Sequence, residues 1–235
     1  MNPYNSSNPP WISASTADIE TRTRAFMRSV YGWMAGGLVI TALAALWVVN
    51  SPMMQAVVLG NPMVMIGLIV AELGIVVFMS VKQRTMSAGA ASAAFLVYSF
   101  LNGLTLSVIL FVYTRSSVTL AFGVSAGMYG AMALYGLVTK RDLTSWGSFF
   151  RMGLFGVIIL MVAGFFIHAT ALQMTIATLG IFVFLGLTAY DNQKLKRLAA
   201  SNPDESVAVF GALMLYLDFI NLFLFVLRLL GNRRQ

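Results

Sequence analysis

The chain has 235 residues, of which 59% are hydrophobic and only 10% are charged, whereas soluble domains carry about 25% charged residues. So few charges cannot cover a water-exposed surface, and the lack of cysteine excludes a disulfide framework, a thiolate metal site and a cysteine nucleophile. The net charge of +7 would suggest nucleic acid as the partner of a soluble protein, but the basic residues fall between apolar segments, so we expect no nucleic-acid partner.

The N-terminal segment is polar and rich in asparagine, serine and proline. This composition favours a disordered or surface-lying tail over residues 1–23, followed by a membrane domain over residues 24–235. The first apolar stretch begins near Ser29 and lacks a small-residue cleavage site. It therefore predicts a retained helix rather than a removed signal peptide.

Seven apolar stretches follow along the chain. They cover residues 30–49, 63–81, 88–112, 118–138, 149–167, 172–190 and 207–230. Each has about the 20 residues that a helix needs to cross ~30 Å of hydrocarbon. The segments between them carry the Pro, Gly, Asn and Ser residues that end helices. The sequence therefore predicts an all-α integral membrane protein with seven transmembrane helices.

The 15 Lys and Arg residues are distributed unevenly between the two sides of this predicted bundle. Eleven lie in the N-terminal segment and near the second, fourth and sixth loops, whereas four lie in the other loops and at the C-terminus. The positive-inside rule then places the N-terminus in the cytoplasm and, with seven crossings, the C-terminus outside. The arginine-rich C-terminus favours a second arrangement, in which the last span is re-entrant and both ends are cytoplasmic.

Three of the eight acidic residues, Glu72, Asp191 and Asp218, lie within or at the edge of apolar stretches. A carboxylate in hydrocarbon is costly unless it is paired, protonated or hydrated, so these residues are candidates for function. The alternative is a structural role, in which each acid forms a hydrogen bond that holds two helices together.

Asp191 and Asp218 form the stronger case, because their positions are related. The segment between them has the composition of a turn and a helix start, with Asn202 as the cap and Pro203 at the first helical position. Asp191 precedes Asp204 by 13 residues and Asp218 follows it by 14. In an antiparallel helix pair that turns at Asp204, these spacings bring the two carboxyl groups to about the same depth, where they can touch.

Two carboxyl groups in contact in a low-dielectric environment cannot both ionise easily, so they share one proton. Such a pair is a pH sensor, and its oxygen atoms attract Ca²⁺ when both acids are ionised. We therefore expect Asp191 and Asp218 to bind protons and, transiently, Ca²⁺, with no resident cofactor. His168, the only histidine, is expected in a solvated loop.

Polar and small residues recur at helical spacing in three of the spans. The last span carries a polar seam made of Gly211, Asp218, Asn221 and Arg228. Such a seam predicts that other helices surround this span. The third span has a similar polar line at Tyr98, Asn102 and Thr105. In the fourth span, small residues four apart predict close helix packing at Gly123, Gly127 and Ala131.

Two motifs in the last two spans are distinctive, GLTAYDNQKLK at residues 186–196 and LYLDFINLF at residues 215–223. Together with VYGWM at residues 30–34 and YGLVTKRDL at residues 135–143, they resemble the transmembrane Bax-inhibitor-motif family, in particular its bacterial members. The resemblance covers the chain after about residue 23. It implies a fold whose last helix is central and surrounded by the other six, and a pH-sensitive calcium leak across a bacterial inner membrane.

The same resemblance assigns roles to individual residues. The paired aspartates of the family correspond to Asp191 and Asp218. Basic residues that close the second span latch this pair in the family, and in this chain Lys82 or Arg84 would do so. The polar tail before residue 23 has no counterpart and should be dispensable for transport.

The main hypothesis is a Ca²⁺ leak channel rather than an enzyme, gated by protonation of Asp191 and Asp218, with Glu72, Asn102 and Asn221 along the ion path. A proton-coupled solute transporter remains an alternative, because intramembrane acids also serve in proton relays. An intramembrane aspartyl protease is less favoured. The second aspartate lacks the preceding Gly-x-Gly of that class, and no Pro-Ala-Leu motif follows it.

Overall fold

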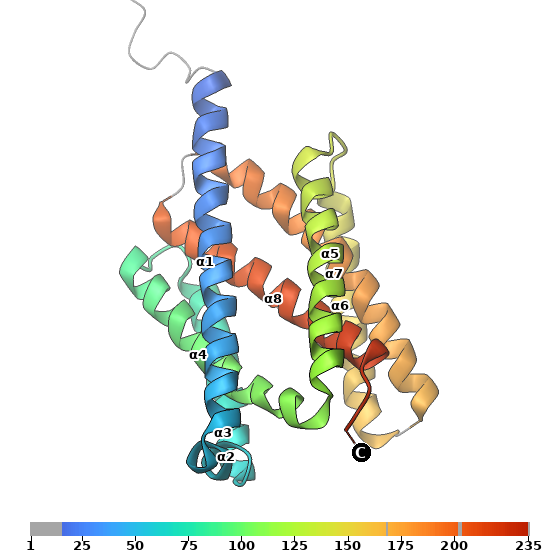
Figure 1. Cartoon of the computed structure of the whole chain (residues 1–235). Helices are drawn as coiled ribbons and strands as arrows, with labels where there is room; N and C mark the ends of the chain where they lie inside the picture. Colours follow the sequence, from blue (N-terminus) through green and yellow to red (C-terminus); the bar gives the residue numbers. More distant parts are fainter. Residues whose placement is uncertain (1–15, 168, 202–203, 235) are drawn as a thin grey trace, which may run out of the picture.

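The computed structural model of the chain describes residues 16–167, 169–201 and 204–234 (Figure 1). Over these ranges the fold is helical, with no strand beyond one isolated β-bridge. The helices are α1 (Thr16–Asn50), α2 (Pro52–Val58), α3 (Pro62–Lys82), α4 (Ala88–Val112), α5 (Arg115–Val138), α6 (Thr144–Phe166), α7 (Thr170–Ala199) and α8 (Glu205–Leu230).

All of these helices except α2 are long and apolar enough to cross a membrane. This finding confirms the predicted all-α membrane fold with seven spans. The short α2 was not predicted, because its seven residues are too few to show a helical period. Ser51 caps α2, and Asn61 with Pro62 at the first helical position starts α3.

The starts of two helices, α1 and α8, differ in detail from the prediction. Helix α1 begins at Thr16, inside the segment expected to form the tail, while residues 1–15 lie outside the described part of the chain. Helix α8 begins at Glu205 with Asp204 as its cap residue. The predicted cap and first turn, Asn202 and Pro203, also lie outside the described residues.

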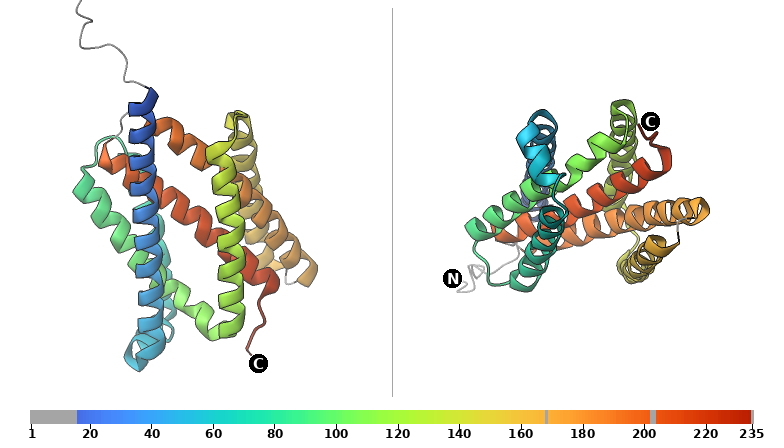
Figure 2. Two further views of the ribbon diagram at one scale, coloured as in Figure 1. Left: turned by 45° about the horizontal axis from the view of Figure 1, so that its top comes forward. Right: turned by 90° about the horizontal axis from the view of Figure 1, so that it is seen from below.

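Helix α8 forms the core of the bundle. Of its apolar span 78% is buried, compared with 6% for α3 and 11% for α6. It packs directly against α7, α1, α5 and α4, whereas α3 packs on α4 and α6 packs on α7. Figure 2 shows α8 running obliquely between α4 and α7. The last helix is therefore flanked closely by four neighbours, with α3 and α6 farther out.

The small residues of α5 do not pack as predicted. Gly123 and Gly127 have open space where a Cβ atom would stand, and Ala131 is exposed. The buried face of α5 is offset by two positions and consists of Ser117, Ala121, Ser125, Tyr129, Ala133 and Gly136. At Gly136 the backbones of α5 and α7 approach closely, since a Cβ atom there would stand 2.2 Å from the carbonyl oxygen of Ala189.

The C-terminal residues are attached to the α4–α5 turn. The backbone N–H of Thr114 donates to the carbonyl of Asn232 (3.1 Å), and the N–H of Arg234 donates to the carbonyl of Val112 (2.9 Å). The N–H of Asn232 also donates to the hydroxyl of Ser117 (2.9 Å). In Figure 1 this attached end lies at the bottom of the bundle, opposite the start of α1 at the top.

Candidate functional site

Asp191 of α7 and Asp218 of α8 meet in the interior of the helix bundle. Both side chains are buried, and their carboxyl groups lie within hydrogen-bonding range of each other. Oδ2 of Asp218 is fully buried and has no hydrogen-bond partner within the described part of the chain. The similar spacings of the two acids from Asp204, 13 and 14 residues, place them together. We call them the aspartate pair.

Close packing of α7 on α8 fixes the depth at which the two acids meet. Gly211 of α8 lies against the side chain of Leu195, where a Cβ atom would stand 2.7 Å away. Farther along, Gly180 of α7 lies against the ring of Phe225, with a corresponding distance of 2.6 Å. One glycine on each helix thus allows α7 and α8 to approach closely, on either side of the aspartate pair.

The aspartate pair lines a cavity of about 480 Å³ between α6, α7 and α8. Its wall is largely apolar and includes Leu154, Val157, Leu187 and Phe225. The polar and charged residues of the wall are Arg151, Tyr190, Asp191, Lys194, Asp218 and Asn221. An apolar cavity with a few converging polar groups is the usual form of a binding site. A hydrated cation or a proton acceptor has room here beside the two carboxyl groups.

Two basic residues share the cavity wall with the aspartate pair, namely Lys194 of α7 and Arg151 of α6. The Arg151 guanidinium also lies 5.8 Å from the centre of the Tyr190 ring, at cation–π distance. Neither was predicted as a partner of the pair, because both were counted among the residues of the loops. Lys82 and Arg84, the predicted latch, lie at the end of α3 and in the following turn and do not line this cavity.

A second polar layer supports the aspartate pair from the side of α1 and α5. The hydroxyl of Tyr31 donates to the side-chain oxygen of Asn192, the residue after Asp191. The amide of Asn192 in turn donates to the carbonyl of Thr188 (2.7 Å). The buried Tyr129 of α5 donates to the sulfur of Met34 of α1 (3.6 Å). These contacts hold the Asp191 end of α7 against the rest of the bundle.

Glu72 belongs to a different polar cluster, between α3, α4 and α8. Its carboxylate accepts hydrogen bonds from the Asn102 amide (3.0 Å) and the Thr105 hydroxyl (2.9 Å). The buried Tyr216 of α8 donates to the side-chain oxygen of Asn102 (2.9 Å) and lies 2.6 Å from the hydroxyl of Thr41. The structure therefore separates Glu72 and Asn102 from the aspartate pair.

Asn221 is the one predicted ion-path residue that shares the cavity with the aspartate pair. Its amide nitrogen donates to the carbonyl of Leu217 one turn earlier (2.8 Å). Among the described residues there is no group of three or more His, Cys, Asp and Glu side chains that could hold a metal ion. His168 lies outside those residues.

A family model described as "Inhibitor of apoptosis-promoting Bax1" matches residues 23–235. Inner membrane protein YbhL of Escherichia coli K12 is 44% identical over 215 residues, which cover 89% of this chain and 92% of that protein. A protein of Deinococcus radiodurans is 42% identical over 220 residues, with 91% and 93% covered. A protein of Borreliella burgdorferi is 39% identical over 215 residues, with 89% and 93% covered.

Proposed function

This chain belongs to the Bax inhibitor-1 family, and on that premise we propose that it is a pH-sensitive leak channel for Ca²⁺ in a bacterial inner membrane. The observation that carries the proposal is the contact between two buried carboxyl groups from different helices, at the wall of a cavity. A protonatable contact between α7 and α8 is suited to gating, because a change in protonation alters the force between the two helices.

The proposed gate works through competition between a proton and a cation. With one proton shared, one carboxyl group donates a hydrogen bond to the other and holds α7 against α8. When both groups are ionised they repel each other, and their oxygen atoms become ligands of the kind that Ca²⁺ prefers. Arg151 and Lys194 line the same cavity, so two positive charges lie close to the aspartate pair.

The proposal is tested by measuring Ca²⁺ flux into proteoliposomes over a pH series. Wild-type flux should change with pH, and either Asp191→Asn or Asp218→Asn should abolish that dependence, because the amide cannot titrate. Asp204→Asn is the matched control, since Asp204 is an exposed acid of the same helix hairpin whose side chain makes no capping hydrogen bond. It should retain the wild-type profile. An unchanged pH profile in both pair variants would reject the gate.

Asn221, Asn102 and Glu72 remain proposed parts of the ion path. Asn221 faces the cavity, so Asn221→Leu should lower Ca²⁺ flux without shifting its pH profile. Glu72 and Asn102 bind each other and tie α3 to α4, which supports a packing role for both. If Glu72→Gln lowers flux while the melting temperature is unchanged, Glu72 acts on the ion and not on packing.

Two other activities would use the same aspartate pair. Paired carboxyl groups can activate a water molecule for peptide hydrolysis. If the protein cleaves transmembrane peptides and Asp191→Asn abolishes the cleavage, the protein is a protease and not a channel. Buried acids can also couple solute uptake to proton flow. Saturable solute uptake driven by a pH gradient, without net Ca²⁺ leak, would indicate a transporter.

A further inference from the structure

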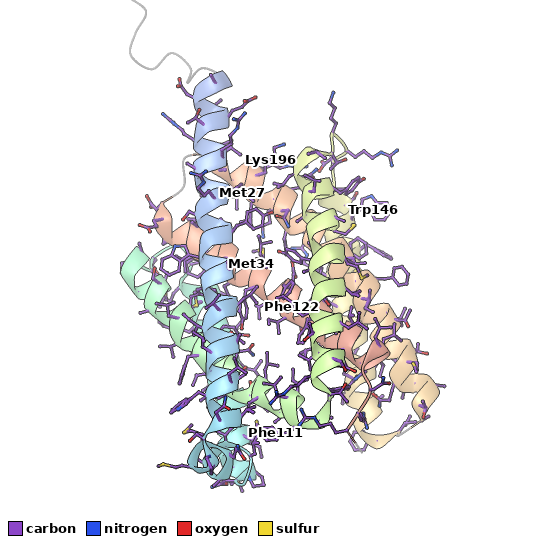
Figure 3. The ribbon with its side chains drawn as sticks, in the orientation of Figure 1. Met27, Met34, Phe111, Phe122, Trp146 and Lys196 are labelled. Atoms are coloured by element: carbon purple, nitrogen blue, oxygen red, sulfur yellow. The ribbon has the colours of Figure 1, made fainter. Side chains whose placement is uncertain are left out.

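A cleft at the N-terminal end of the bundle is not used by the proposed channel. It has a volume of about 950 Å³ and lies between the first turns of α1, the end of α5, the following loop and the end of α7. Figure 3 labels Lys196 near the upper ends of α1 and α5, at this end of the molecule. We call it the basic cleft, because five of its lining residues are cationic, namely Arg24, Lys140, Arg141, Lys196 and Arg197.

The positive charge of the basic cleft is only partly neutralised. Of its lining residues, two are acidic, and each already pairs with an arginine of the cleft: Glu20 with Arg24 (3.2 Å) and Asp142 with Arg197 (2.6 Å). Lys196 donates to the carbonyl of Leu137 at the end of α5 (2.5 Å).

Lys140 and Arg141 carry two of the three positive charges that no acid neutralises, the third being that of Lys196. Within the described part of the chain, their side chains make no hydrogen bond or ion pair, and both residues are exposed. An anion can therefore approach them without displacing an existing partner.

The loop that carries these two residues is held in place by α7. The side-chain amide of Gln193 donates to the carbonyl of Arg141 (2.8 Å), and its oxygen accepts from the N–H of Leu143 (2.9 Å). Arg197 also donates to the Gln193 oxygen (2.5 Å). The cationic side of the cleft is thus fixed before any ligand binds, which lowers the entropic cost of binding.

The other side of the basic cleft is apolar and faces outward. Leu134 and Val138 on the last turns of α5 are 60% and 65% exposed, and Ile19 of α1 is 38% exposed. At the same end of the molecule, Trp146 in the first turn of α6 is 56% exposed, as aromatic side chains are at a membrane–water interface. A soluble anion gains nothing from this apolar wall, whereas a phospholipid buries its acyl chain there.

We propose that the basic cleft binds an anionic phospholipid of the membrane leaflet on the N-terminal side. Lys140 and Arg141 would contact the phosphate, and Leu134 with Val138 would contact the first part of an acyl chain. Basic pockets between transmembrane helices on the cytoplasmic side recognise anionic head groups in this way. This inference does not depend on the proposed ion flux.

Lipid binding is tested with the full-length protein in detergent, by native mass spectrometry during titration with phosphatidylglycerol or phosphatidylcholine. Wild type should bind phosphatidylglycerol in preference. Juxtamembrane cations attract anionic lipids individually, so the double variant Lys140→Gln/Arg141→Gln should lose that preference by roughly tenfold or more. The matched control, Arg22→Gln/Arg28→Gln, removes two exposed cations of α1 that do not line the cleft and should bind as wild type does.

Two further measurements separate the lipid from other phosphates. Leu134→Ser/Val138→Ser leaves the charge unchanged and should weaken phosphatidylglycerol binding, while glycerol phosphate should fail to compete for the site. Equal loss of preference in the Arg22/Arg28 control, or full preference in Lys140→Gln/Arg141→Gln with an unchanged melting temperature, would overturn the proposal. If glycerol phosphate competes effectively, the ligand of the basic cleft is a soluble phosphate compound and the lipid proposal is wrong.

Discussion

The side chain of Asp142 joins the α5–α6 loop to two helices. Its Oδ1 accepts hydrogen bonds from the N–H (3.0 Å) and hydroxyl (2.6 Å) of Thr144 at the start of α6 and from Arg197 of α7 (2.6 Å). The hydroxyl of Thr144, followed by Arg197, holds the pKa of Asp142 well below its ordinary value of 3.8. Although exposed, this carboxylate keeps the loop attached to the helix that carries Asp191.

We expect Asp142→Asn to lower the melting temperature in detergent by a few degrees at pH 6. A group whose pKa is lowered by folding stabilises the folded state above its ordinary pKa, and this contribution declines as the pH falls below that value. The difference in melting temperature between wild type and variant should therefore be constant from pH 5 to 7 and shrink below about pH 3.8. A difference that grows on acidification would contradict this assignment.

The control for this measurement is Glu20→Gln. Glu20 also pairs with an arginine, Arg24, but both side chains are largely exposed and lie on one helix. Such pairs contribute about 0–1 kcal/mol. This variant should melt as wild type does over the same pH range.

The sequence predicted the aspartate pair but not most of its surroundings. Contact between Asp191 and Asp218 follows from their nearly equal spacing on the two sides of a turn, which is a local property of a helix hairpin. The approach of Arg151 depends on how α6 packs on α7, and the bond from Tyr31 to Asn192 joins residues 161 positions apart. No periodic pattern within a single helix encodes such contacts between distant segments.

At the scale of the helices, Gly136 decides how closely α5 approaches α7. A Cβ atom at this position would stand 2.2 Å from a backbone oxygen of Ala189, which cannot move aside as a flexible side chain can. We expect Gly136→Ala to separate the helices and lower the stability by about 1–3 kcal/mol, measured as unfolding in a denaturing detergent series. Loss of stability should be accompanied by a widened basic cleft.

Gly127→Ala is the matched control on the same helix. Open space surrounds the Cβ position of Gly127, so the substitution meets no neighbour in the described structure. Alanine also favours the helix over glycine by about 1 kcal/mol. Gly127→Ala should therefore leave the stability unchanged or raise it, and a loss equal to that of Gly136→Ala would contradict the packing described here.

The incorrect prediction for the small residues of α5 has a physical cause. Two series of residues four apart run along this helix. One is small throughout (Gly123, Gly127, Ala131), and the other contains a tyrosine (Ala121, Ser125, Tyr129, Ala133). In water the more apolar series would face the core, but lipid is as apolar as a neighbouring helix, so hydrophobicity does not choose between them. Two contacts decide which series is buried. Gly136 allows the backbone of α7 to come close, and the Tyr129 ring packs on Phe219 of α8.

At the scale of the whole molecule, α8 is a continuous apolar helix of 26 residues, and the start of α1 and the end of the chain lie at opposite ends of the bundle (Figure 1). This arrangement favours seven crossings over a re-entrant last span. The distribution of Lys and Arg then supports a cytoplasmic N-terminus, which remains a proposal.

The lack of cysteine makes this orientation directly testable. Two exposed positions are suited to a single cysteine: Thr21 on α1 and Asn232 beyond the end of α8. The variants are Thr21→Cys and Asn232→Cys. An impermeant thiol reagent added to intact spheroplasts should label Asn232→Cys at once and Thr21→Cys only after permeabilisation. Wild type, which has no thiol, is the control for background labelling. Protection of both sites in intact cells would instead support six crossings.

The attachment of the C-terminal residues to the α4–α5 turn limits how α8 can move when the protonation of Asp218 changes. Sliding of α8 along its axis would break the backbone bonds of Asn232 and Arg234. Swinging the opposite end sideways, with these bonds as the fulcrum, would leave them intact. Any rearrangement that starts at the carboxyl groups should therefore tilt α8 about its attached C-terminal end and not shift it along its axis. The largest displacement is expected at the end of α8 that follows Asp204.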